Sequence, residues 1–321
     1  MTPRPLPAVT TILVSAALLT SCGREKSGNP GPPADLEGAD AAYHHTREIL
    51  SFGPRPPGSA ALAKTRAYLA ARLRESGWQV ARQDIEGRGP QGPLTFVNLL
   101  ARFGPPGEPA LWTRPVKGLL GAHIDSKYFP DRTFLGADDA ASAAGVILEL
   151  ARRLAARPDH ARQLELVFFD GEEAFALNMP PAEFLSRPGY DGLYGSRYYA
   201  RGWRARPDKP AFGLILDMIG HNDLRVRYPS DSPPRLVEVL RRAARHEGVA
   251  DRFAPADTPI IDDHVPLNNA GIPTLDIIGD FANAPWWHTE NDSLDLVSKQ
   301  SLDITLRVVQ RMLDHLLDQP S

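Results

Sequence analysis

Four segments of the sequence are almost wholly apolar, and each delivers charged or imidazole side chains at or near its carboxyl end. They span residues 116–123, 163–170, 211–220 and 272–278, and the side chains are His123 with Asp125, Glu172 with Glu173, Asp217, and Asp276. A near-continuous apolar run is typical of a strand buried on both faces of a parallel sheet. Because an unpaired buried carboxylate is costly, a purely structural sheet has no use for these acids. The pattern favours an α/β sheet with a site at one edge.

Helix-like segments alternate with these strands along the chain. We expect helices at residues 40–50, 60–76, 193–204, 234–246 and 298–317, and a further long helix that begins near Asp138. Strand-like runs at 78–85 and 94–103 are separated by a Gly/Pro loop, 224–228 is a short strand, and 260–267 is a loop or short helix. We therefore predict an α/β fold in one domain, with a mostly parallel, twisted central sheet flanked by helices on both faces.

Composition limits the function classes. The chain has 321 residues, of which 42% are hydrophobic, and this is enough for one large α/β domain or two small ones. Acids and bases are interspersed and the net charge is −3, so we expect no nucleic-acid partner. The 31 prolines predict many rigid loops, which argues against a helical bundle or a repeat array.

The first 22 residues have the form of a signal peptide. Arg4 precedes an apolar core at residues 12–19, which is too short to span a bilayer comfortably. Residues 19–22, Leu-Thr-Ser-Cys, resemble the cleavage box of bacterial lipoproteins, in which the cysteine is lipidated; a plain signal peptide is the alternative. Cys22 is the single cysteine, so the folded part has neither disulfides nor thiol catalysis.

These features predict an exported bacterial lipoprotein that faces the periplasm. It would touch the membrane only through a lipid anchor on Cys22, and the outer membrane is favoured because no Asp follows this cysteine. Residues 23–38 are rich in Gly, Pro and charge, and we expect a flexible tether there. The catalytic domain is then expected at residues 39–318.

Residues 121–145 form one strand–loop–helix unit that carries several metal-ligand types. His123 and Asp125 lie at the end of the strand, and Asp138 and Asp139 lie at the start of the helix. Ligands of open α/β sheets bind outside the carboxyl ends of the strands. Histidine and carboxylates at that edge are what a divalent metal requires. The alternative is that His123 caps the strand and the Asp pair caps the helix.

The adjacent pair Glu172 and Glu173 follows a wholly apolar strand. Two neighbouring carboxylates can divide the work, one binding a metal and the other, with a raised pKa, moving protons. A solvated acidic turn is the alternative. His288, after Trp286 and Trp287, adds an imidazole. Oxygen and imidazole donors without thiolates suit a catalytic zinc site with an open position.

These residues resemble the motifs of the zinc-dependent aminopeptidase superfamily and, within it, of the glutaminyl cyclases. The resemblance covers about residues 40–317. The superfamily features are His123 to Asp125, Asp138, Glu172–Glu173, Asp217 and His288. The segments that are similar to the cyclases in particular are residues 126–129, 169–175, 193–197, 262–266 and 287–288. The resemblance implies the zinc aminopeptidase-like fold.

It further implies a glutaminyl-peptide cyclotransferase, which converts the N-terminal Gln of peptides or proteins to pyroglutamate and releases ammonia. One zinc ion would be held by Asp138, Glu173 and His288. Zinc would act as a Lewis acid on the γ-carboxamide, and Glu172 would be the general acid and base. The partners would be peptides or proteins that begin with Gln.

Further roles carried over by the resemblance concern the surroundings of the reacting groups. Asp217 would lie near the reacting amine, Asp262 would belong to a hydrogen-bonded network, and Trp287 would line the substrate pocket. Two positions depart from the animal cyclases: Asp276 replaces a His, and Asn178 replaces a Trp. An Asp262–Asp276 network needs a shared proton, so the two would titrate as a unit.

A two-zinc aminopeptidase is the main alternative. Its five expected ligands are present, with Asp138 as the bridge: His123, Asp138, Glu173, Asp217 and His288. In that enzyme Glu172 would be the base for a metal-activated water. A receptor-type ectodomain is a third interpretation, but it would be expected to have lost Glu172 or a ligand. The cyclase-like segments and Asp262 lead us to expect the cyclase.

Overall fold

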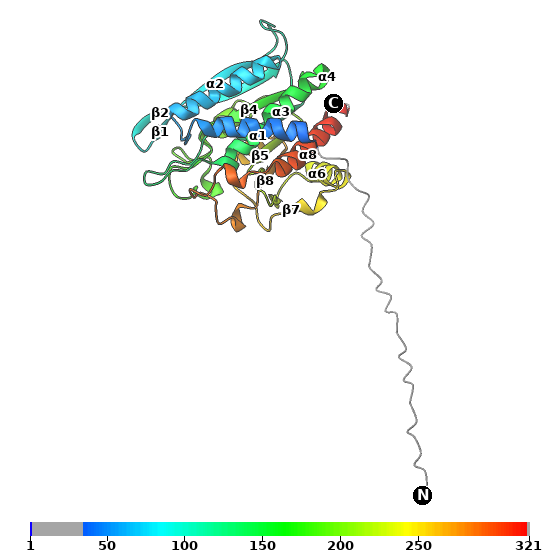
Figure 1. Ribbon diagram of the computed structural model, residues 1–321. Coiled ribbons are helices and arrows are strands. Elements are labelled where there is room, and N and C mark those ends of the chain that lie inside the picture. Colours follow the sequence, from blue (N-terminus) through cyan, green and yellow to red (C-terminus); the bar gives the residue numbers. More distant parts are fainter. Residues whose placement is uncertain (2–34, 320–321) are drawn as a thin grey trace. The chain divides into compact units, whose positions relative to one another are not determined.

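The computed structural model describes Met1 and residues 35–319 (Figure 1). The predictions of a signal peptide, of a lipid anchor on Cys22 and of most of the tether lie outside the described residues. Within residues 35–319, no helix combines the length and the apolar character needed to cross a bilayer.

A six-stranded sheet lies at the centre of the described part (Figure 1). Its strands, in spatial order, are β1 (Trp78–Gly89), β2 (Gly92–Phe103), β4 (Leu164–Phe169), β3 (Gly118–His123), β5 (Phe212–Asp217) and β8 (Thr274–Ile278). The last four are parallel, whereas β1 and β2 form an antiparallel hairpin that joins β4 antiparallel. The short strands β6 (Val226–Tyr228) and β7 (Phe253–Pro255) pair separately. The predicted α/β fold with a mostly parallel sheet is confirmed.

Helices cover both faces of this sheet. The main helices are α1 (Leu36–Ser51), α2 (Ala60–Glu75), α3 (Ala143–Ala155), α4 (Pro158–Ala161), α5 (Tyr194–Arg201), α6 (Pro234–His246), α7 (His264–Asn269) and α8 (Lys299–Asp318). Short helical turns are η1 (Ala137–Ser142), η2 (Ala182–Phe184), η3 (Ala250–Arg252), η4 (Phe281–Asn283) and η5 (Leu294–Leu296). Figure 1 shows α1 crossing the same side of the sheet as α3 and α8, and these helices pack together.

Alternate strand residues face two separate apolar cores. Leu120, Leu166 and Leu214 belong to the core that contains residues of α1, α2, α3, α6 and α8. Their neighbours Leu119 and Val167 belong to the second core, which contains residues of α5 and α7. Because successive side chains of a strand point to opposite faces, an apolar run with no alternation is what a sheet covered on both faces requires.

The first helix begins before the predicted domain boundary at residue 39. Helix α1 starts at Leu36, and the Asp35 side chain caps it by accepting a hydrogen bond from the Gly38 N–H. The end of the predicted tether, residues 36–38, is therefore helical. Helix α1 is tied to α2 by a contact of 2.6 Å between His45 Nδ1 and the Tyr68 hydroxyl.

The helix expected from residue 138 onward does not begin as a regular helix. Residues Ala137–Ser142 form the irregular turn η1, in which Asp139 has φ −103° and ψ 85°. Regular α-helix starts only at Ala143. Neighbouring side chains in η1 therefore leave the backbone in directions that a helix would not give.

Candidate metal centre and active site

Three neighbouring parallel strands bring their carboxyl ends to the same edge of the sheet. His123 is the last residue of β3, Asp217 is the last residue of β5, and Glu172 and Glu173 follow β4. Because β4, β3 and β5 are adjacent and parallel, residues far apart in the sequence meet there. This edge is where the sequence analysis expected the site.

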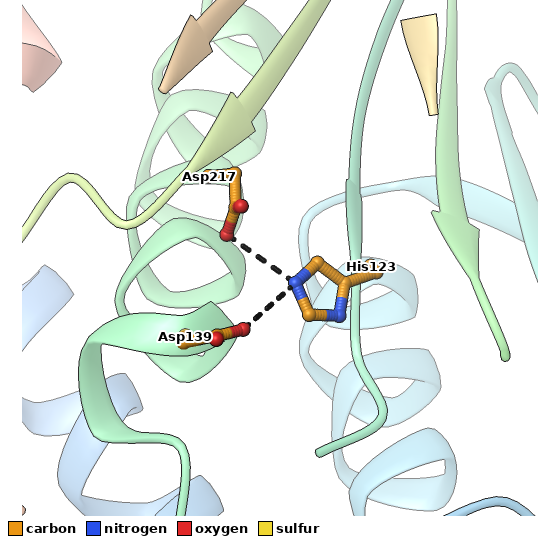
Figure 2. A group of neighbouring side chains, drawn as sticks. All are labelled: His123, Asp139 and Asp217. Atoms are coloured by element: carbon orange, nitrogen blue, oxygen red, sulfur yellow. Dashed lines mark hydrogen bonds and ion pairs between the residues drawn. The ribbon is translucent and has the colours of Figure 1, made fainter. Parts of the chain in front are cut away.

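One group of donors is centred on His123 (Figure 2). Its Nε2 atom lies 3.2 Å from Asp139 Oδ1 and 3.3 Å from Asp217 Oδ1. All three side chains are buried, and their donor atoms are close enough together to hold one metal ion.

A second group is centred on His288. Its Nε2 atom lies 3.1 Å from Glu173 Oε1 and 3.5 Å from Asp139 Oδ2. Asp139 thus turns one oxygen to each group, so the two groups share a bridging carboxylate. His288 has φ 56° and Met218, after Asp217, has φ 52°. Such left-handed conformations of non-glycine residues cluster at functional sites.

Asp138 does not join either group, and this corrects its predicted place as a metal ligand. Its Oδ1 atom accepts a hydrogen bond of 2.5 Å from the Gly220 N–H. Burial, with repulsion from Asp292, raises the pKa of Asp138 to about 8. The irregular backbone of η1 turns Asp139 toward the imidazoles instead. In both the one-zinc and the two-zinc arrangement, Asp139 therefore takes the position that the sequence analysis gave to Asp138.

The charges of the two groups favour a cation. Burial lowers the pKa of His288, but its contacts with Glu173 and Asp139 together outweigh burial and raise this pKa to about 9. Burial likewise opposes protonation of His123, yet contacts with Asp125, Asp139 and Asp217 raise its pKa well above the ordinary value. For Asp139, burial would raise the pKa, but the two imidazoles hold it below its usual range.

A divalent ion would supply the positive charge that these carboxylates otherwise take from protonated imidazoles. Carboxylate oxygens and imidazole nitrogens, without a thiolate, are a donor set that suits zinc. The residues present therefore fit zinc: Asp139, Glu173 and His288 in one group, and His123, Asp139 and Asp217 in the other.

Two buried aspartates hold the backbone of the site. Asp292 accepts hydrogen bonds from the N–H groups of Asp138 (2.8 Å) and Asp139 (3.2 Å). Asp125 accepts hydrogen bonds from the N–H groups of Glu172 (3.2 Å) and Glu173 (3.3 Å). Asp125 was expected at this edge, whereas Asp292 was missed because nothing in its local sequence distinguishes it from a loop residue.

Two basic residues also shape the site and were given no role from sequence. Lys127 Nζ lies 3.2 Å from Glu173 Oε2 and donates to the Ala174 carbonyl at 2.9 Å. The fully buried Arg55 donates to the carbonyls of residues 124, 135 and 136 at 3.3, 2.7 and 2.8 Å. Arg55 thereby joins the chain after β3 to the chain before η1. The Gly/Pro-rich segment around it gave no sign of this contact.

A cavity of about 400 Å³ opens beside the donor groups. Of the residues singled out from sequence, Glu172, Glu173, Asn178, Asp217, Asp262, Trp287 and His288 line it. Apolar walls are supplied by Leu177, Met179, Ile260, Ile261 and Phe281. A few convergent polar groups within an apolar wall are typical of a small-molecule site.

Glu172 is the carboxyl group of this cavity that is best placed to move protons. Its side chain is buried, and burial, with repulsion from Glu173, Asp262 and Asp263, raises its pKa well above the ordinary value even though His123 opposes this. In contrast to Glu173, it belongs to neither donor group. A carboxyl group with a raised pKa that is not a ligand can act as a general acid and base.

Asp276 is buried inside β8 and is not among the residues that line the cavity. Its Oδ2 atom lies 3.2 Å from His264 Nδ1. Burial and the neighbouring Asp276 raise the pKa of Asp262 to about 8, and burial raises that of Asp276 well above its ordinary value. Two such carboxyl groups can stay close together because protons remain on the pair near neutral pH.

The family model for peptidase family M28 matches residues 103–313 of this sequence. The chain therefore belongs to peptidase family M28. It is 28% identical over 296 residues to glutaminyl-peptide cyclotransferase from Bothrops jararaca, a match that covers 80% of this chain and 76% of the relative.

Solved structures agree with this assignment. Porphyromonas gingivalis glutaminyl cyclase is similar with a TM-score of 0.75 and 31% identity, covering 88% of this chain and 99% of that one. A Zn-dependent exopeptidase from Parabacteroides distasonis gives a TM-score of 0.72 and 26% identity, covering 88% and 98%. The resemblance to glutaminyl cyclases within the zinc aminopeptidase superfamily is thus confirmed.

Proposed function

We propose that this protein is a zinc-dependent glutaminyl-peptide cyclotransferase. It would convert the N-terminal Gln of peptides and proteins to pyroglutamate and release ammonia. Similarity to glutaminyl cyclases over most of the chain supports the assignment. The observation that carries it is Glu172, a buried carboxyl group with a raised pKa that shares one cavity with Trp287 and the His288 donor group.

The proposed zinc ligands are Asp139, Glu173 and His288. When bound, zinc supplies Lewis-acid polarisation of the substrate γ-carboxamide. The α-amino nitrogen of the substrate attacks the γ-carbonyl carbon, and the carbon–nitrogen bond of the carboxamide breaks. Glu172 takes a proton from the attacking amine and returns it to the departing ammonia, so no proton is gained or lost overall.

The walls of the cavity hold the substrate in the folded shape that this attack needs. The Trp287 ring stacks on the His288 ring with centroids 3.9 Å apart, which fixes an aromatic surface beside the donor group. Asp217 lines the same cavity and would accept a hydrogen bond from the amine. Since nucleophile and electrophile belong to one residue, such positioning provides much of the rate acceleration.

A two-zinc aminopeptidase is the second candidate, and one observation favours it. His123, Asp139 and Asp217 form a complete second donor group that shares its bridging carboxylate with the first. The similarity to a Zn-dependent exopeptidase agrees with this reading. In that enzyme the two ions together would activate a water molecule, with Glu172 as its base.

The test is a direct assay of the full-length protein with zinc. Peptides that begin with Gln or with Leu are incubated together, and the products are read by mass spectrometry. Loss of ammonia from the Gln peptides alone supports the cyclase. Release of N-terminal residues, from Leu peptides above all, would overturn the cyclase and assign the aminopeptidase.

The first prediction concerns Glu172→Gln. We expect turnover to fall by about 100-fold or more because the variant cannot carry the proton. Zinc content should stay at the wild-type value, because Glu172 belongs to neither donor group. Rates and metal content are measured on the same preparation.

The matched control is Glu238→Gln, the same chemical change on the exposed surface of α6. It should leave both quantities unchanged. A Glu172→Gln variant with wild-type turnover would exclude Glu172 as the proton carrier.

A further inference from the structure

A second hollow, of about 310 Å³, lies beside α5 and α7 and shares no lining residue with the candidate active site. Three arginines line it: Arg197, Arg201 and Arg204. Glu183, Ser186 and Asn269 are its other hydrogen-bonding side chains. We name it the arginine hollow.

The arginines of this hollow have no acidic partner among the described residues. Arg197, Arg201 and Arg204 are each more than ion-pair distance from every carboxylate in that part of the chain, although Glu183 lines the same hollow. Arg206, two residues beyond Arg204, instead pairs with Asp208 at 2.7 Å. Three like charges have thus gathered at one place with a single, unpaired carboxylate beside them, and this excess of positive charge points to an external anion.

Arg197 is held firmly in place. Its guanidinium donates to the carbonyls of Tyr190 (3.0 Å) and Arg187 (3.3 Å) and lies 5.0 Å from the centre of the Tyr190 ring. Burial, together with repulsion from Arg201, lowers the pKa of Arg197. Arg201 and Arg204 are exposed, and their guanidinium groups donate to no protein atom in the described part of the chain. Their donors remain available to a ligand.

The charge of the hollow selects the ligand. Three guanidinium groups against one carboxylate leave a net formal charge of about +2. A dianion would compensate this charge fully, whereas a ligand with one carboxylate would leave half of the positive charge uncompensated. Arginine forks bind phosphate oxygens in pairs, and Ser186 and Asn269 add neutral donors.

We propose that the arginine hollow binds a dianionic phosphate group, either as the free ion or as a phosphomonoester. Its volume exceeds that of one phosphate, which leaves room for the ester group. The proposal is independent of the function proposed above. One apolar cluster connects the two cavities: it contains Leu185 of the hollow and Met179 and Ile261 of the active-site cavity. Because a substitution in the hollow could act on turnover through this cluster, the test measures phosphate binding and not activity.

The experiment is calorimetric titration of the full-length protein at constant ionic strength, with inorganic phosphate as the probe. The test variant is Arg201→Gln with Arg204→Gln; both residues are exposed, so we expect it to fold. The matched control is Arg74→Gln with Arg88→Gln, which removes the same charge from two arginines that have no ion pair in the described part. We expect one saturable phosphate site that weakens about tenfold or more in the test variant and is unchanged in the control.

Two further probes identify the source of the phosphate. Equal binding of methyl phosphate supports a phosphomonoester ligand, and binding of inorganic phosphate alone supports the free ion. Dimethyl phosphate, a monoanion, should bind with an affinity that is lower by about tenfold or more. The proposal is overturned if phosphate does not saturate, if the Arg201/Arg204 variant binds it as the wild type does, or if dimethyl phosphate binds equally well.

Discussion

Asp138 and Asp139 are neighbours in sequence with opposite surroundings. The Asp138 carboxyl group accepts a hydrogen bond from the Gly220 N–H, and burial raises its pKa to about 8. The Asp139 carboxylate faces the imidazoles of His123 and His288. The sequence could predict that this pair lies at a metal site, but not which of the two faces it, because the irregular turn η1 leaves no mark in residue type.

This difference predicts opposite results for two matched variants. Asp139→Asn should weaken zinc binding by more than about 100-fold, because it removes a carboxylate that belongs to both donor groups. Asp138→Asn should retain zinc, because its amide oxygen can still accept the Gly220 hydrogen bond. Metal content after dialysis against a weak chelator measures both.

The two variants differ by one position and carry the same chemical change, so each is the control of the other. Retention of zinc by Asp139→Asn together with its loss from Asp138→Asn would restore Asp138 as the ligand.

Sequence reasoning found the site residues whose chemistry shows in their type and position. Glu173, His288, His123 and Asp217 each follow or end a strand or stand beside aromatic residues, and the structure brings all four together. Asp292 was not predictable in this way. Its hydrogen bonds run to backbone N–H groups 153 and 154 residues away, and the path of a loop over that distance is not encoded locally.

At the scale of elements, Arg55 connects segments that have no regular structure of their own. Its three carbonyl acceptors lie at the two ends of the single loop that joins β3, which ends at His123, to η1, which carries Asp139. Asp292, Asp125 and Asp139 attract its charge, whereas burial lowers its pKa to about 10. Arg55 is therefore a positioning residue that holds the two ends of this loop together.

Arg55→Met should lower the free energy of unfolding by about 3 kcal/mol or more, because three carbonyl groups lose the hydrogen bonds that the buried guanidinium donates. Urea unfolding followed by circular dichroism measures the change. Arg74→Met, at the exposed end of α2, is the control and should change stability by less than about 0.5 kcal/mol. Equal stability of Arg55→Met and the wild type would show that other groups hold this loop.

The buried strands were the most predictable elements, and the hairpin was the least. Apolar runs predicted β3, β4, β5 and β8 to within a few residues. The Gly/Pro loop expected between residues 85 and 94 is instead a two-residue turn, because β1 and β2 stay paired up to Gly89 and Gly92. Cross-strand pairing overrode the local turn signals there. Helix α1 began early because one aspartate caps it.

For the whole molecule, the alternation of apolar strands with helices was enough to predict the layered architecture. Both sheet faces are covered because the strands carry apolar side chains on both sides. The family match and the structural neighbours agree with this reading. The attachment of the chain to a membrane remains a proposal that rests on the sequence of residues 1–22.

We predict that Cys22→Ala releases the protein from the membrane fraction into the soluble periplasmic fraction when it is expressed in a Gram-negative host. Cys22 is the single cysteine of the chain, so no other residue can take the lipid that is proposed for it. Ser21→Ala is the control and should stay in the membrane fraction. An unchanged distribution of Cys22→Ala would exclude the lipid anchor. Separation of the inner and outer membranes by density would show which of them holds the wild-type protein, and we expect the outer membrane.

The contact between Lys127 and Glu173 bears on the choice of metal. Lys127 Nζ engages Oε2 of Glu173, while Oε1 of the same residue faces His288. With this contact in place, Glu173 would offer a single oxygen to an ion and would not act as a bidentate ligand. Calcium requires six to eight oxygens and often gains two from one carboxylate, whereas zinc is satisfied by about four donors. In the proposed zinc site, this buried ammonium group would thus limit the coordination number and disfavour calcium relative to zinc.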